Sequence, residues 1–139
     1  PSVGDEVQSE YFVSRETVAD ALGALPQFAD VFARLAHSME IRAVAGDSLS
    51  ASPFATGEML AIHLTWRRDP DAVRRELPAL EAALGHPRPH WGKLHAAPPQ
   101  QLSEQFPGLH ALDGEARRHD PSGMFRNAWV ERLLGNEPA

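Results

Sequence analysis

The sequence contains no cysteine, and its 139 residues include a single lysine, Lys93, among thirteen lysines and arginines. Without cysteine there can be no disulfide framework, no thiolate nucleophile and no cysteine-based metal site. No apolar run is long enough to span a membrane and no signal peptide opens the chain, so we expect a cytoplasmic protein. The first residue is Pro1 rather than methionine, which indicates a processed chain or a fragment of a longer protein.

Several sequence motifs that carry chemistry are also missing. The seven histidines include no HExxH pair, and we expect no metal site. The sequence has no GxSxG elbow, no Walker loop and no GxGxxG motif. A nucleotide cofactor would therefore have its phosphates bound outside this chain. The net charge of −6 argues against nucleic acid as a partner, because phosphate neutralisation dominates such binding.

What is present indicates one globular domain over residues 1–139, with 42% hydrophobic and 23% charged residues. Period-two patterns predict strands, and Ser14 and Asp69-Pro70 are expected to begin helices. Pro78 lies inside the second of these helices. The predicted strands cover residues 8–13, 39–44, 59–67 and 88–94, and helices are expected at 14–25, 69–84 and from Pro98 onward.

The order strand, helix, strand, strand, helix, strand predicts an α+β protein with the ferredoxin-like split β-α-β-β-α-β arrangement. Its antiparallel sheet would have helices on one face, leave the other face free, and be followed by C-terminal helices. Residues 45–58 are small, polar and rich in turn formers, which is typical of a loop. The side chains expected to face the helices are Met39, Ile41, Leu60, Ile62, Leu64 and Trp66.

The same alternation places four polar side chains on the free face: Glu40, Arg42, His63 and Thr65. A solvated face with a surface Glu–Arg ion pair explains this pattern as well as a binding site does. His63 could reach a ligand or hydrogen-bond the neighbouring strand.

The single lysine stands in the rigid stretch Arg88-Pro89-His90-Trp91-Gly92-Lys93-Leu94-His95. Lysine is a compact, mobile point charge, whereas arginine is a planar fork, so a lysine in an arginine-rich chain indicates a specific requirement. A chance survival is the alternative.

Five segments occur in an order that resembles one protein family. They are Gln8-Ser9-Glu10-Tyr11-Phe12-Val13, Glu40-Ile41-Arg42, Ile62-His63-Leu64-Thr65-Trp66, Arg88-Pro89-His90-Trp91-Gly92-Lys93, and Asp120-Pro121-Ser122-Gly123-Met124-Phe125-Arg126-Asn127. The series is similar to the C-terminal part of FAD-dependent alditol (xylitol or sorbitol) oxidases, which belong to the vanillyl-alcohol-oxidase superfamily and are related to sugar-1,4-lactone oxidases. The chain departs from the family pattern mainly at residues 45–57.

The resemblance implies that this chain is a substrate domain whose FAD-binding domain, with its covalent flavin, lies outside it. It implies catalytic roles for Arg42 and Lys93, and substrate contacts for Glu40, Arg42, Thr65 and Lys93; we add His63 because it shares their face. The implied reaction oxidises a primary alcohol of a polyol and reduces O2 to H2O2. The isolated chain is then expected to bind no FAD, to be inactive and to self-associate. The alternatives are a sugar-1,4-lactone oxidase and a non-catalytic α+β binding or dimerisation module.

Overall fold

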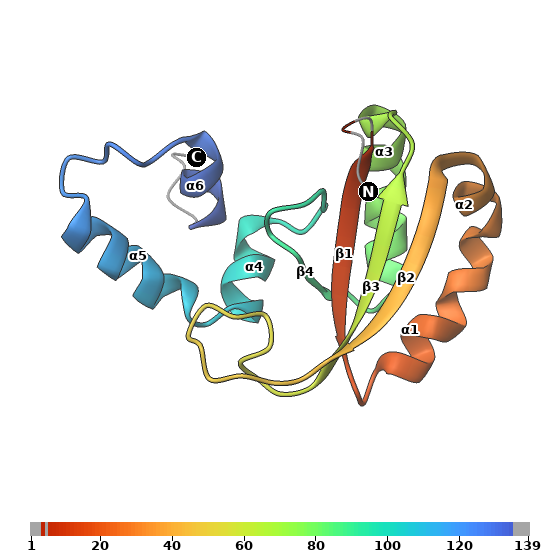
Figure 1. Cartoon of the computed structure of the whole chain (residues 1–139), viewed down its shortest axis with the longest axis horizontal. Coiled ribbons are helices and arrows are strands. Elements are labelled where there is room, and N and C mark those ends of the chain that lie inside the picture. The colour runs from red at the N-terminus through yellow and green to blue at the C-terminus, as the bar shows by residue number, and fades with distance from the viewer. Residues whose placement is uncertain (1–3, 5, 135–139) are drawn as a thin grey trace.

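A four-stranded antiparallel sheet with the strand order β2-β3-β1-β4 forms the centre of the molecule (Figure 1). The structure is a computed structural model that describes residues 4 and 6–134. The strands are β1 (Val7–Ser14), β2 (Ala36–Val44), β3 (Met59–Trp66) and β4 (Arg88–Pro89). Helices α1 (Val18–Ala24), η1 (Leu25–Phe28) and α2 (Ala29–Leu35) connect β1 to β2, and α3 (Pro70–Ala83) connects β3 to β4. The predicted ferredoxin-like α+β fold is confirmed.

The helix-covered face of the sheet holds the main core. Tyr11, Ile62, Leu64 and Trp66 are completely buried there, beside helical residues such as Leu77. Their burial follows from the period-two alternation that the sequence shows on β3. The edge strand β2 is less covered: Ile41, which was expected to face the helices, is 49% exposed.

The two connecting helices begin differently. Helix α3 has the expected start, because the Asp69 carboxylate accepts a hydrogen bond from the Ala72 N–H at 2.9 Å and Pro70 occupies the first turn. The prediction that Ser14 caps α1 was wrong. Ser14 still pairs with Met59 as the last residue of β1, so the chain turns before Thr17 becomes the N-cap.

The prediction of a strand over residues 88–94 was too long. Only Arg88–Pro89 forms regular β-structure, opposite Tyr11 and Phe12. The chain then turns, because the Lys93 N–H donates to the His90 carbonyl at 2.9 Å. Even so, the segment stays along β1: the His90 N–H donates to the Glu10 carbonyl at 2.8 Å and the Leu94 N–H to the Gln8 carbonyl at 2.9 Å.

A second, smaller core lies beyond β4, where Figure 1 shows the C-terminal helices to one side of the sheet. They are α4 (Pro99–Gln105), α5 (Leu109–His119) and α6 (Ala128–Leu133). Phe106, Leu109 and Leu133 are buried there, and Trp91 packs against them. Among the helices of residues 4 and 6–134, none combines the length and apolar character needed to cross a membrane.

Loop 45–58 covers part of the face that the helices leave open, which corrects the expectation of a free face. The Phe54 ring meets the Phe12 ring edge-on at 4.8 Å, and both pack with Met59 and Ala61. The loop is held by Arg88, whose guanidinium donates to the Pro53 carbonyl and lies 5.3 Å from the centre of the Phe106 ring. The part of this face that carries Glu10, Glu40 and His63 lies outside that apolar cluster.

Candidate active site

Three polar side chains share one row across the open face of the sheet. Glu10 on β1 pairs with His63 on β3, and His63 pairs on its other side with Glu40 on β2. Their neighbours Tyr11, Ile62 and Leu64 point into the core, so the three side chains point to the opposite face. Glu10 and His63 are nearly buried, with 8% and 6% of their surface exposed.

Lys93 reaches this row from the turn after β4. Its ammonium donates to Glu10 Oε2 at 2.7 Å and lies 3.1 Å from His63 Nδ1. The backbone bonds that hold His90 and Leu94 to β1 fix the turn and therefore the direction of the lysine side chain. The chain's only lysine thus lies at the most buried part of the cluster.

Arg42 completes the cluster from the next row of β2. Its guanidinium donates to Glu40 Oε2 at 2.5 Å and to Glu10 Oε1 at 3.5 Å. The residue opposite Arg42 on β3 is Ala61, whose small side chain leaves room for the diagonal contact with Glu10. About half of the Arg42 and Glu40 side chains is exposed, so these two present their polar atoms to solvent.

The electrostatics favour two anions, two cations and a neutral imidazole. Burial alone would raise the pKa of Glu10, but the hydrogen bond and charge of Lys93, with the nearby His63 and His90, lower it. The hydrogen bond and charge of Arg42 lower the pKa of Glu40. Burial lowers the pKa of His63, and the Lys93 charge lowers it further. His63 is therefore neutral at pH 7.

A neutral His63 fits its two neighbours in one tautomer. The Lys93 ammonium can only donate hydrogen bonds, so His63 Nδ1 must be the acceptor. The single N–H proton of the neutral imidazole then lies on Nε2. Nε2 lies 3.4 Å from the Thr65 hydroxyl and can donate to it. His63 thus connects Lys93 to Thr65 and performs the strand-bridging role that the sequence left open, while facing the same surface.

All five predicted site residues therefore lie in one hydrogen-bonded cluster: Glu40, Arg42, His63, Thr65 and Lys93. The residue that sequence reasoning missed is Glu10, which contacts both cations. Its signal was available, because the inward positions of Tyr11 and Val13 require Glu10 to point to the polar face. Whether the five residues bind substrate stays a prediction.

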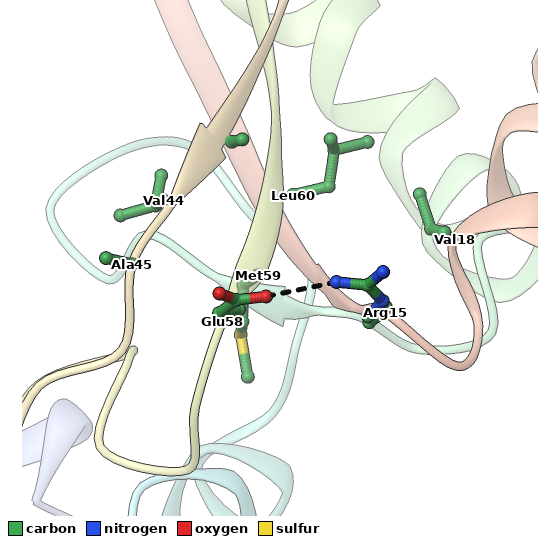
Figure 2. Close-up of a pocket in the computed structure, with 8 residues that line it drawn as sticks. Arg15, Val18, Val44, Ala45, Glu58, Met59 and Leu60 are labelled. Carbon is green, nitrogen blue, oxygen red and sulfur yellow. Dashed lines mark hydrogen bonds and ion pairs between the residues drawn. The ribbon is translucent and has the colours of Figure 1, made fainter.

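An apolar pocket of about 310 Å³ lies elsewhere, where β2 and β3 meet the loop (Figure 2). Val18, Val44 and Leu60 are among the residues that line it, and the Arg15–Glu58 ion pair at 3.3 Å lies at its edge. It contains none of the clustered polar residues, so the chemistry described above is not located there.

The comparison with known families decides the classification. Residues 5–133 match the model of the family described as D-arabinono-1,4-lactone oxidase. The chain belongs to this family. It is 38% identical to an alditol oxidase of a Streptomyces species over 136 residues, which are 96% of this chain and 33% of that protein. It is 22% identical to the L-gulonolactone oxidase of Mus musculus over 135 residues, covering 90% of this chain and 30% of the relative.

The family match confirms the resemblance read from the five segments. The chain spans about a third of the length of the relatives it matches. The matched region includes every residue of the polar cluster, from Glu10 to Lys93.

Proposed function

We propose that this chain is the substrate-binding part of an FAD-dependent oxidase that converts the primary alcohol of an alditol, such as xylitol or sorbitol, to an aldose. In the overall reaction, RCH2OH and O2 give RCHO and H2O2. The observation that carries the proposal is the pair of cations, Arg42 and Lys93, on the part of the sheet face that lies outside the apolar cluster of loop 45–58. The identity to an alditol oxidase supports the substrate class.

The chain's residues fit the substrate side of a flavin site rather than the cofactor's phosphates. Two cations, a neutral imidazole and a hydroxyl offer hydrogen bonds to oxygen atoms, whereas the sequence has no phosphate-binding glycine motif. The FAD would then be held by a partner domain of the same protein. When bound, the flavin supplies the acceptor for the hydride that leaves the alcohol carbon.

The residues on this face would bind and polarise the alcohol. Lys93 and Arg42 stabilise the negative charge that develops on the reacting oxygen, because preorganised cations are most effective where water is scarce. Glu40 accepts hydrogen bonds from substrate hydroxyls and holds Arg42 in place. Thr65 both donates and accepts, which suits a polyol with several neighbouring hydroxyl groups.

Replacing Lys93 with methionine in the full-length protein tests the proposal. We expect peroxide formation from xylitol or sorbitol to fall by about 10²–10³-fold, the usual cost of losing one oxyanion-stabilising donor. Bound flavin should be unchanged, because Lys93 is not placed among the cofactor's ligands. Arg74→Met is the matched control: Arg74 is exposed on α3, pairs only with Asp71 in the bonds seen for it, and should leave turnover unaltered. Near-normal turnover of Lys93→Met would refute the assignment.

A sugar-1,4-lactone oxidase is the second candidate, favoured by the name of the matched family. Oxygen consumption by the full-length protein, measured across alditols and sugar 1,4-lactones, separates the two. A preference for lactones would replace the alditol proposal. Absence of turnover with both classes would favour a binding module without chemistry.

A further inference from the structure

Glu10 is the one carboxylate of residues 4 and 6–134 within ion-pair distance of Lys93. Its two oxygens are divided between the two cations: Oε2 accepts from Lys93 at 2.7 Å, and Oε1 accepts from Arg42 at 3.5 Å. His63 Nδ1 lies 3.6 Å from Oε1. With both oxygens engaged and 8% of the residue exposed, Glu10 has little left to offer a substrate.

The charges of the cluster balance only when Glu10 is included. Glu10 and Glu40 carry two negative charges, Arg42 and Lys93 carry two positive charges, and His63 is neutral. Glu40 is half exposed and contacts Arg42, so it cannot replace Glu10 at the lysine. Without Glu10, Lys93 would keep His63 Nδ1 as its remaining side-chain partner in the contacts seen here. A flexible four-carbon side chain with one neutral partner would no longer have a single position.

We infer that Glu10 is a positioning residue, which holds Lys93 and Arg42 at fixed places on the open face so that both can act on the same substrate oxygen. The inference rests on the proposed function for the reaction itself. The pairing of Glu10 with Lys93 stands on geometry and can be measured without turnover. Glu40 also faces the cluster, but it contacts Arg42 rather than Lys93. His90, which follows β4, contacts Glu10 through its backbone N–H, which donates to the Glu10 carbonyl.

The first experiment measures the pairing. Lys93 is the only lysine of this chain, so the rate at which an N-hydroxysuccinimide ester labels it can be followed in its tryptic or chymotryptic peptide by mass spectrometry. In the full-length protein, Glu10→Gln should raise this rate by about tenfold, because the neutral amide keeps the shape but no longer forms the charged hydrogen bond at 2.7 Å that holds the Lys93 amine against Glu10. Glu40→Gln is the control and should leave the rate within twofold of the original protein, since Glu40 contacts Arg42 rather than Lys93.

The second experiment measures the consequence for the reaction. Glu10→Gln should lower kcat by about 30–100-fold with a smaller effect on KM, because the cations are misplaced for the transition state. The double variant Glu10→Gln/Lys93→Met should lose less than the product of the two single losses, since the part of the Glu10 effect that acts through Lys93 disappears once Lys93 is gone and only the part that acts through Arg42 remains. Glu10→Asp should recover part of the loss. Glu58→Gln, at an exposed carboxylate remote from the cluster, should match the original protein.

The outcomes separate the two proposals. Unchanged Lys93 labelling in a folded Glu10→Gln variant overturns the inference, and so do normal turnover or additive losses in the double variant. If Glu10→Gln does not fold, Glu10→Asp is used for the same labelling and kinetic comparison. Should the original protein oxidise neither alditols nor lactones, the proposed function fails, and the labelling experiment alone decides whether Glu10 holds Lys93.

Discussion

Glu81 is a buried carboxyl group whose removal should destabilise the protein in a pH-dependent way. Its Oε1 accepts hydrogen bonds from the Tyr11 hydroxyl at 2.9 Å and from the Ala96 N–H at 2.7 Å, and the residue is 4% exposed. Glu81→Ala would leave the fully buried Tyr11 hydroxyl without its partner. A buried unsatisfied donor costs about 1–3 kcal/mol, and the partly exposed Ala96 bond adds about 1 kcal/mol, so we expect a loss of about 2–4 kcal/mol.

The pH dependence follows from the charge of Glu81. Burial raises the pKa of Glu81, although its hydrogen bonds with the Ala96 backbone and Tyr11 lower it in part. Since the folded pKa lies above the unfolded one, the unfolded state loses its proton first as the pH rises above about 4. The contribution of Glu81 to stability is therefore complete at acidic pH and decreases as the pH rises through the folded pKa. The cost of Glu81→Ala should be largest near pH 4–5 and smaller at pH 8.

Urea unfolding at pH 5 and pH 8 measures this, with Glu81→Gln as the matched variant. The glutamine keeps a carbonyl acceptor for Tyr11 and Ala96 but carries no charge, so its stability should stay within about 1 kcal/mol of the original protein at pH 5. At pH 8 it should equal or exceed that of the original protein. A glutamine variant as unstable as the alanine variant would refute the hydrogen-bond argument. A cost for Glu81→Ala that grows from pH 5 to pH 8 would refute the assigned direction of the pKa.

Three further predictions concern packing and assembly. Gly108→Ala should destabilise the protein measurably in thermal unfolding, because a Cβ there would lie 1.6 Å from the Ser50 carbonyl oxygen. Gly114→Ala in α5 is the contrasting variant: a Cβ there meets nothing within 4 Å, so alanine should stabilise the helix by about 0.5–1 kcal/mol. The purified chain alone should retain no FAD, and a flavin absorbance near the protein's own stoichiometry would contradict the proposed division into two parts. The chain should also self-associate through apolar surface, since Met124 and Phe125 are 78% and 80% exposed. Light scattering should show weaker association in Met124→Ser/Phe125→Ser. A monodisperse monomer of the unaltered chain at high concentration would exclude self-association.

The side of the sheet that each residue faces was predictable because alternation is a local property. Leu60, Ile62 and Leu64 define one face of β3, and this places His63 and Thr65 on the other without any knowledge of pairing. The start of α3 was predictable for the same reason, since Asp69 and Pro70 act within one turn.

Contacts between distant segments were not predictable in this way. The meeting of Glu10 and Lys93 depends on the register of β1 and on the turn after His90, and neither is encoded in a short window. Loop 45–58 was recognised from its composition, but composition does not say that Phe54 packs on Phe12. Composition and family resemblance both singled out Lys93, and alternation places Glu10 on the polar face, but the contact of Glu10 with both cations became evident only when the strands were paired.

The strand order has a consequence for how this part of the protein can be produced and divided. The first of the four strands along the chain, β1, lies inside the sheet between β3 and β4. Its residues pair with residues about fifty positions later on β3 and about eighty positions later on β4. Such long-range pairings make folding slow, because the entropy cost of closing large loops comes before the paired strands gain stabilising contacts. Deleting Val7–Ser14 would split the sheet through its interior rather than shorten an edge. A ribosome must therefore complete β4 before this face, with its cations in place, can exist at all.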